Sequence, residues 1–331
     1  MDSEEQVVRA KPNIKLSQIL EMPLAFGNIY WLKEKSEGKI KIAYAGEPLN
    51  QRLLNKFNEN HNFYIERIVE RESFLTFKAK LNSFHSGITE RSRLESMVNF
   101  LCLIKAKYYQ EGQEESLLSL LAACYEVFQF EDFNFYEELF EFNTSLFRRS
   151  IRNAALAVAF AMASGYSDRE LLKDFYNINF FSVYSFLKEN NLKMTLAALE
   201  QERAIPGSLK EKYQLSDIDT FNKLTEEFES KIKNKTLKKY VKMPFEKLNG
   251  KGLPLGFSED EMNDLESIFV FLSNSTTYND FEFLPLDGKG YLYAMLKTEQ
   301  ALSGNFRIKR QLADRFEKLE PIEKSYLEMM A

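Results

Sequence analysis

The side chains most often used for catalysis and metal binding are scarce in this sequence. The chain of 331 residues has two histidines, His61 and His85, and two cysteines, Cys102 and Cys124. Histidine is the commonest metal ligand and the usual general base near neutral pH, so a site built from several histidines is excluded. We interpret each histidine as a surface or turn residue and each cysteine as a buried free thiol. Carboxylates are plentiful, but no spacing singles out an acid–base pair.

The most distinctive pattern is the stretch from Phe245 to Gly256, which reads Phe-Glu-Lys-Leu-Asn-Gly-Lys-Gly-Leu-Pro-Leu-Gly. Three glycines and a proline fall within seven residues. Glycine reaches positive φ at little cost and proline fixes its own φ, so the pattern predicts a sharply turning loop. A basic run, Lys231–Lys242, precedes it. After it, Ser258 and Glu261 are typical of a helix start, as the N-cap residue and its capping-box partner.

This loop resembles the signature of the HD-GYP family, bacterial phosphodiesterases that open the cyclic dinucleotide cyclic di-GMP. That signature reads roughly His-His-Glu-Arg/Lys-x-Asn/Asp-Gly-x-Gly-Tyr-Pro-x-Gly. The positions that match in register are Glu246, Lys247, Asn249, Gly250, Gly252, Pro254 and Gly256. The two histidines are replaced by Pro244 and Phe245, and the tyrosine by Leu253. The resemblance implies that the loop keeps the backbone shape of the signature but lacks the side chains that serve catalysis.

Weaker matches flank the loop and extend the resemblance over about residues 145–320. The stretch 149–152 resembles the family's first helix, with Arg149 where the first histidine would stand. Residues 165–171 resemble the turn into its second helix, and 265–270 resemble the helix that ends in a ligand aspartate. Residues 304–306 resemble a Gly-x-Phe element near its C-terminus. Counted from these matches, the family's other ligand positions fall on Phe181, Ser182, Pro244, Phe245 and Asn274.

The resemblance implies a catalytically inactive regulatory protein. Family members hydrolyse a phosphodiester with metal ions that position and activate a water, and none of the matching positions carries a good ligand for a transition metal. We therefore expect no cofactor and a role that depends on protein partners, with cyclic di-GMP left open as a ligand. Phosphates and guanine edges are bound well by Lys and Arg. The candidate ligand-binding residues near the matching elements are Arg149, Arg152, Lys247, Asn249, Lys251 and Arg307.

Two other functions stay open from the sequence. One is a residual metal-dependent phosphodiesterase with a non-standard site made of carboxylates. The other is a purely structural scaffold whose Phe-rich surface mediates assembly, and the family resemblance suggests a homodimer. The net charge of −5 argues against broad nucleic-acid binding, which needs a basic footprint.

The sequence predicts a small α+β N-terminal module followed by a mostly α C-terminal domain of the HD-GYP type. We expect a disordered leader over 1–13, the module over 14–71, a helical connecting region over 72–143 and the degenerate HD-GYP-like domain over 144–331. Asn143 or Thr144 is the expected N-cap of the first helix of that last domain.

Within the module, 27–32 and 40–45 have strand character and flank a polar turn, which predicts a hairpin. A short helix is expected over 50–58 and a strand over 63–66. In the connecting region, 130–142 is acidic and aromatic, and we interpret it as an amphipathic helix that packs its phenylalanine side inward.

We expect a cytoplasmic protein. The first residues are acidic and lack the basic and apolar regions of a signal peptide. The longest apolar run, 154–163, is too short to span a bilayer. Free cysteines also fit a reducing compartment.

Overall fold

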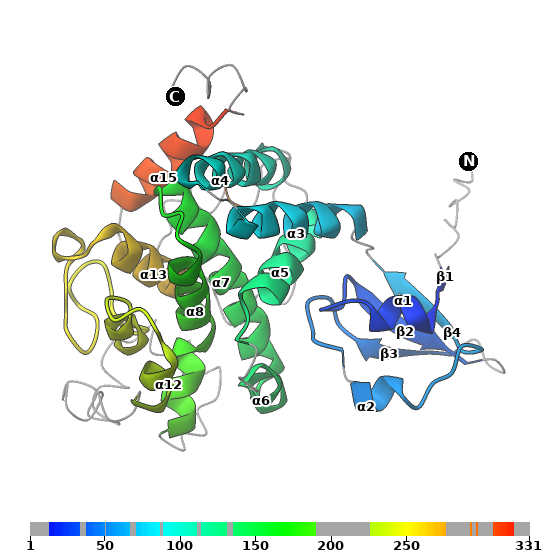
Figure 1. Cartoon of the computed structure of the whole chain (residues 1–331). Coiled ribbons are helices and arrows are strands. Elements are labelled where there is room, and N and C mark those ends of the chain that lie inside the picture. The colour runs from blue at the N-terminus through cyan, green and yellow to red at the C-terminus, as the bar shows by residue number, and fades with distance from the viewer. Residues whose placement is uncertain are drawn as a thin grey trace, which may run out of the picture.

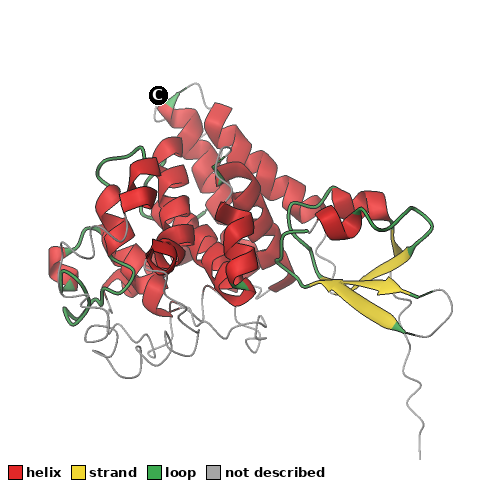
Figure 2. Cartoon of the chain, turned by 90° about the horizontal axis from the view of Figure 1, so that it is seen from below, coloured by secondary structure: helices red, strands yellow, loops and turns green. Residues whose placement is uncertain are grey.

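A computed structural model of the chain describes residues 13–33, 38–49, 51–66, 71–86, 89–110, 114–130, 135–189, 226–275, 292, 296 and 307–320. Figure 1 shows a small sheet-containing module beside a larger body of helices, and Figure 2 shows both parts from below. The coarse prediction of a mostly helical protein with a small α+β module is confirmed. The predicted leader lies outside the described residues, except that Asn13 already belongs to the first strand.

The module is built on a four-stranded antiparallel sheet with the strand order β1-β4-β2-β3. Its described elements are β1 (Asn13–Ile14), α1 (Leu16–Leu20), β2 (Asn28–Leu32), β3 (Lys39–Ala43), α2 (Gln51–Leu54) and β4 (Asn62–Glu66). The predicted hairpin is the β2–β3 pair. The strand predicted after it is β4. The helix expected over 50–58 is α2, which ends at Leu54, and α1 was not predicted.

The two faces of this sheet differ because successive strand residues point to opposite sides. Ile29 of β2 lies opposite Ile65 of β4, and these side chains are buried in the core together with Phe63. Tyr30 lies opposite Tyr64, and the two rings stack with centroids 4.7 Å apart and planes within 6°. One face therefore anchors the module to its core, and the other carries a stacked tyrosine pair.

The helical body follows the module directly. Its described elements are α3 (Arg71–Ser86), α4 (Glu90–Ile104), the π-helix η1 (Lys105–Gln110), α5 (Glu114–Phe128), α6 (Phe135–Phe142), α7 (Thr144–Ala163), α8 (Arg169–Glu189), α12 (Glu226–Lys231), the 3₁₀ helices η2 (Lys238–Lys242) and η3 (Glu259–Glu261), α13 (Asp264–Ser275) and α15 (Arg307–Lys318). None of the described helices combines the length and apolarity needed to cross a bilayer.

Helix α7 is the centre of this body. It packs against α4, α5, α6, α8, α13 and α15, and Figure 1 shows it running through the body with other helices around it. Nearly every residue from Leu146 to Met162 is buried. The middle of the helix is rich in a residue that favours helix formation and takes little space, and its fully buried alanines are Ala154, Ala155, Ala157, Ala159 and Ala161. Neighbouring helices can therefore approach it closely on several sides.

Helix α6 packs as its sequence predicted. The rings of Phe135 and Tyr136 contact the ring of Phe181 on α8, with centroid distances of 5.9 and 4.7 Å. Phe142, at the end of the helix, is 42% exposed. The described part of the predicted amphipathic segment therefore turns most of its aromatic side inward.

The start of α13 corrects one prediction. The Ser258 backbone N–H donates to the Glu261 carboxylate at 2.9 Å, as one arm of a capping box requires, and the Ser258 hydroxyl donates to the same carboxylate at 2.9 Å. The helix that begins there is only the single 3₁₀ turn η3, and the backbone is extended again at Met262. Asn263 then caps α13, accepting a hydrogen bond from the Glu266 backbone N–H at 2.9 Å.

The predictions for the histidine and cysteine residues are confirmed for His61 and Cys124 only. His61 is in a turn, with Nδ1 2.8 Å from Asn58 Oδ1, and the His85 side chain lies outside the described atoms. Cys102 and Cys124 are free thiols. Cys124 is buried, whereas Cys102 is only half-buried, which corrects the expectation for that residue.

Removing the N-cap of α7 should destabilise the protein. Asn143 Oδ1 accepts a hydrogen bond from the Leu146 backbone N–H at 2.9 Å, which confirms Asn143 as the N-cap. Asn143→Ala is expected to lower the free energy of unfolding by about 1 kcal/mol, measured by urea denaturation. Asn143→Asp keeps the acceptor and should stay within a few tenths of a kcal/mol of the parent chain. Equal losses in both variants would contradict this role.

Candidate functional site

The loop from Phe245 to Gly256 turns sharply, and its glycines account for the shape. Gly250 and Gly256 have φ angles of +73° and +67°, in the left-handed region that favours glycine. A Cβ atom at Gly252 would lie 2.1 Å from the backbone nitrogen of Lys247. Two arms of the loop meet at that point, so no residue with a side chain fits there without moving the backbone.

The carboxylate of Glu246 holds this loop together from the inside. The residue is fully buried, and its carboxylate accepts hydrogen bonds from the backbone N–H groups of Leu255 at 2.5 Å and Gly256 at 3.1 Å. Burial raises the pKa of the Glu246 carboxyl above its ordinary value, and the backbone hydrogen bonds counter only part of that shift. Glu246 thus binds the backbone of its own loop.

Three segments far apart in the sequence meet at this loop. Arg149 of α7 is buried and donates from Nη2 to the carbonyl oxygen of Ser273 on α13 at 2.7 Å. The next residue, Asn274, donates from Nδ2 to the carbonyl oxygens of Val270 at 2.7 Å and Glu246 at 2.9 Å. The positions at which the resemblance places a ligand histidine and a ligand aspartate therefore connect α7, α13 and the loop.

The remaining ligand positions of the resemblance are occupied by core residues. Phe181 is fully buried, with ring centroids of Tyr136 and Phe228 at 4.7 and 5.6 Å. Ser182 and Pro244 are also buried, and Phe245 is half-buried and packs against the core. Among the residues that the structure describes, no group of three or more His, Cys, Asp or Glu side chains is placed to hold a metal ion.

The predicted ligand-binding residues fall into a buried set and an exposed set. Arg149 and Arg152 are each 3% exposed, and Lys247 is half-buried. Asn249 and Lys251 are exposed on the loop, where Asn249 Oδ1 accepts a hydrogen bond from the Lys251 backbone N–H at 3.0 Å. These five residues do not present one continuous accessible face.

The last predicted residue lies on a different element. Arg307 is the first residue of α15, and its side chain is outside the described atoms. Two neighbouring cations on the same helix differ in exposure, since Lys309 is buried and Arg310 is exposed.

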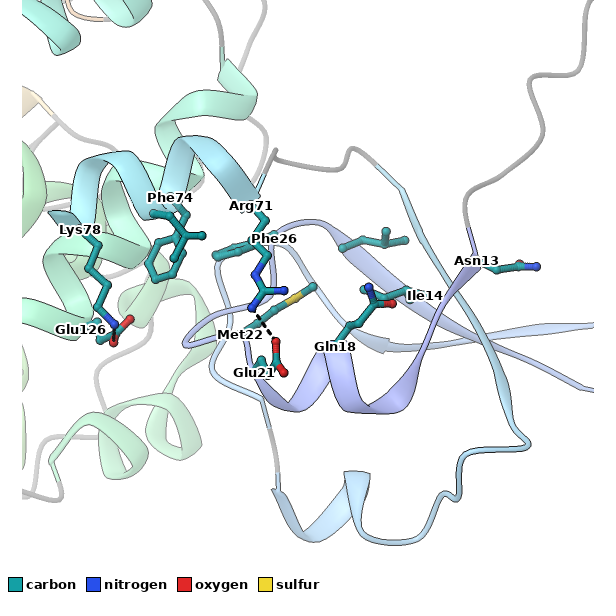
Figure 3. Close-up of a pocket in the computed structure, with 12 residues that line it drawn as sticks. Asn13, Ile14, Gln18, Glu21, Met22, Phe26, Arg71, Phe74, Lys78 and Glu126 are labelled. Atoms are coloured by element: carbon teal, nitrogen blue, oxygen red, sulfur yellow. Dashed lines mark hydrogen bonds and ion pairs between the residues drawn. The ribbon is translucent and has the colours of Figure 1, made fainter.

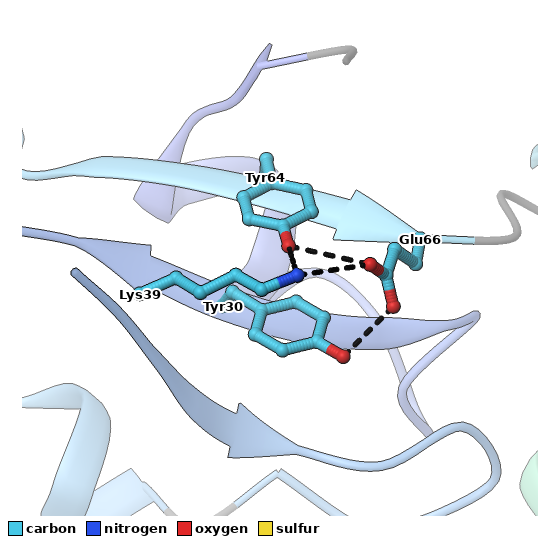
Figure 4. A network of polar contacts seen from close by, with 4 residues as sticks. All are labelled: Tyr30, Lys39, Tyr64 and Glu66. Atoms are coloured by element: carbon cyan, nitrogen blue, oxygen red, sulfur yellow. Dashed lines mark hydrogen bonds and ion pairs between the residues drawn. The ribbon is translucent and has the colours of Figure 1, made fainter. Parts of the chain in front are cut away.

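A polar network on the module was not predicted from the sequence. Lys39 Nζ donates to Tyr64 Oη at 2.6 Å and contacts Glu66 Oε1 at 3.3 Å, while Tyr30 Oη donates to Glu66 Oε2 at 2.8 Å (Figure 4). Desolvation, followed by the hydrogen bond to Glu66, raises the pKa of Tyr30 to about 12. The hydrogen bond from Tyr30 helps to lower the pKa of Glu66. The network joins β2, β3 and β4 and leaves these four groups occupied with one another.

Comparison with known proteins adds no family to this description. No protein-family model matches the chain, and neither a curated protein nor a solved structure matches it significantly. The HD-GYP resemblance therefore rests on the loop and the segments around it.

The close backbone approach at Gly252 gives a stability prediction. Gly252→Ala should lower the free energy of unfolding by about 3 kcal/mol or more, because the added methyl group overlaps the Lys247 backbone. Gly165 is a matched control with φ of +94° and open space around it. Gly165→Ala should cause only the loss of about 1–2 kcal/mol expected from backbone strain. Similar losses in urea denaturation would rule out the steric role of Gly252.

The raised pKa of Glu246 predicts a pH-dependent stability difference. Above the ordinary value of 4.5 the unfolded chain ionises this carboxyl while the folded chain resists ionisation, so the folded state loses stability as pH rises towards the raised pKa. Glu246→Gln removes this titration. The free energy of unfolding of the variant minus that of the parent should therefore increase as pH rises above 4.5, measured by denaturation at each pH.

Glu261 supplies the control of opposite sign. Hydrogen bonds from Ser258 lower its pKa below 4.5, so Glu261 stabilises the folded state above that pH and loses this contribution as the solution becomes more acidic. For Glu261→Gln, the free energy of unfolding of the variant minus that of the parent should fall as pH rises towards 4.5. If the same free-energy difference for Glu246→Gln stays flat or falls as pH rises, the pKa of Glu246 is not raised in the folded protein.

Proposed function

We propose that this chain is a catalytically inactive, HD-GYP-like regulatory protein that acts through protein partners. The proposal rests on the hydrogen bonds that the buried side chains of Arg149 and Asn274 make. A guanidinium keeps its positive charge at all relevant pH values, so a buried Arg149 disfavours a metal cation beside it. Both side chains donate to backbone carbonyl groups. A position built for metal ligands would instead present acceptor atoms.

The convergence of the three segments supports the resemblance behind this proposal. A shared metal site requires residues of the first helix, the loop and the later helix to come together in space. Contacts from Arg149 to Ser273 and from Asn274 to Glu246 bring those segments into that arrangement. The proposal interprets these contacts as packing contacts left in the fold after loss of the metal ligands.

Under this proposal the loop binds a protein partner rather than cyclic di-GMP. Of the candidate residues whose side chains are described, Asn249 and Lys251 are exposed, while Arg149 and Arg152 are buried. Leu255 adds a side chain that is 37% exposed on the same loop. The loop backbone is held by Glu246, so these exposed groups are presented in a fixed arrangement, which lowers the entropy lost on binding a partner. A cytoplasmic location and a homodimer are expectations of the same proposal.

The absence of catalysis is tested first. Purified chain is incubated with cyclic di-GMP and added Mn²⁺ or Fe²⁺, and the linear dinucleotide is measured by chromatography. We expect no product above the protein-free blank. Linear product, together with near-stoichiometric iron or manganese in the purified protein, would overturn the proposal in favour of a residual phosphodiesterase.

Calorimetric titration then separates partner binding from nucleotide sensing. Cyclic di-GMP is titrated into the chain, with the linear dinucleotide as the control ligand. The buried arginines lead us to expect no saturable heat. Saturable binding of the cyclic form that is lost in Lys251→Ala would instead make the loop a nucleotide receptor, and light scattering on the same sample tests the homodimer.

A further inference from the structure

A pocket of about 460 Å³ lies between the module and the helical body. The module contributes β1, α1, the segment after α1 and β4, and the body contributes α3 and α5 (Figure 3). This volume falls in the range of small-molecule sites in proteins. The walls come from both parts of the chain, so an occupant would contact the module and the body together.

The floor of the pocket is apolar. Phe26 and Phe74 are buried there, with ring centroids 5.2 Å apart, and Ile65 of β4 lies beside them. Met22 is half-buried and points into the pocket in Figure 3. Leu75 also lines the pocket and is 48% exposed. An apolar molecule would remove from water the apolar surface that is still exposed here, chiefly that of Met22 and Leu75, which is favourable in proportion to the area covered.

The charges around the pocket are balanced in pairs. Arg71 Nη2 lies 2.7 Å from Glu21 Oε2, and Lys78 forms an ion pair with Glu126. The paired charges give the pocket no net charge that would attract an ionic ligand. A charged ligand would therefore lose hydration against the apolar floor without gaining an opposite charge in return, which is unfavourable. The lining therefore selects against ligands with a net charge.

Two amide side chains complete the lining. Asn13 and Gln18 are exposed residues at the module side of the pocket. Amides both donate and accept hydrogen bonds, so they can bind a neutral hydroxyl, carbonyl or amide group at the end of an apolar ligand.

We propose that this junction pocket binds a small uncharged molecule with an apolar body and one hydrogen-bonding end. Phe26, Met22 and Phe74 contact the body of the ligand, and the amides contact its polar end. Because the pocket bridges both parts of the chain, the ligand stabilises their observed arrangement. This inference goes beyond the proposed function and does not depend on it, since the pocket residues are separate from the loop and from α13.

The test uses two dyes that differ by one charged group. N-phenyl-1-naphthylamine is uncharged, and 8-anilinonaphthalene-1-sulfonate carries a sulfonate on a closely similar frame. Each is titrated into the full chain, and fluorescence is recorded. We expect saturable binding of the uncharged dye at one site. The anionic dye should bind about tenfold more weakly, because its sulfonate would lose hydration near the apolar floor. Equal affinities, or no saturable binding of the uncharged dye, would overturn the proposal.

Two leucine variants locate the dye. Leu75→Trp places a bulky ring in the pocket and should weaken binding of the uncharged dye by about tenfold. Leu94 on α4 is similarly exposed, at 42%, and does not line the pocket. Leu94→Trp should leave the affinity unchanged. Equal effects in these two surface variants would place the dye elsewhere and contradict the proposal.

A charge variant tests whether the paired charges of the lining disfavour charged ligands. Glu21→Gln leaves Arg71 without its carboxylate, so the affinity for the anionic dye should rise while that for the uncharged dye stays within about twofold. No change for the anionic dye would contradict the argument from charge balance. Binding of the uncharged dye only to a chain lacking residues 2–12 would overturn the proposal and assign the pocket to that segment.

Discussion

The structure depends on the close packing of helices around α7. A helix surrounded by neighbours can be buried over its length only if its side chains are small or fit between those of adjacent helices. The alanines from Ala154 to Ala161 meet that condition, and larger residues such as Phe160 fill the spaces between, with the Phe271 ring of α13 6.4 Å away. Because α4, α5, α6, α8, α13 and α15 all use this one helix, the packing of α7 determines where the loop and the aromatic clusters lie.

Three buried polar residues of this packed body make specific contacts with the backbone. Burying a guanidinium, an amide or a carboxyl is unfavourable unless its hydrogen bonds are made. Arg149 and Asn274 meet this requirement at backbone carbonyl oxygens, and Glu246 meets it at backbone N–H groups of its own loop. Directional contacts of this kind select one arrangement of α7, α13 and the loop, whereas apolar packing alone would tolerate several.

The junction between the two parts of the chain combines apolar and charged contacts. Arg148 of α7 forms an ion pair with Glu47 of the module, and its guanidinium carbon lies 4.6 Å from the Tyr44 ring centroid. On α3, Phe74 packs against Phe26 of the module. These contacts orient the module on the helical body and leave the junction pocket open between them, so the pocket is a product of how the parts dock.

Local features were predictable from the sequence because they depend on neighbouring residues. Glycine spacing predicted the sharp loop, Asn143 predicted a helix start, and two segments of strand character on either side of a polar turn predicted the β2–β3 hairpin. The short helix α1 was missed because five residues are too few to show a period. The helix expected after Ser258 stopped after one turn, since the next residue is extended and Asn263 starts α13 instead.

Only the tertiary structure decided which of these residues meet. Spacing could place Arg149 and Asn274 at equivalent positions of a known pattern, but it could not show that one donates to Ser273 and the other to Glu246. It also could not separate the buried Arg152 from the exposed Lys251, because exposure depends on helices from elsewhere in the chain. The sequence by itself determined local conformation and the types of group available. Their burial, their partners and the junction pocket arise from contacts between distant segments, which no local pattern encodes.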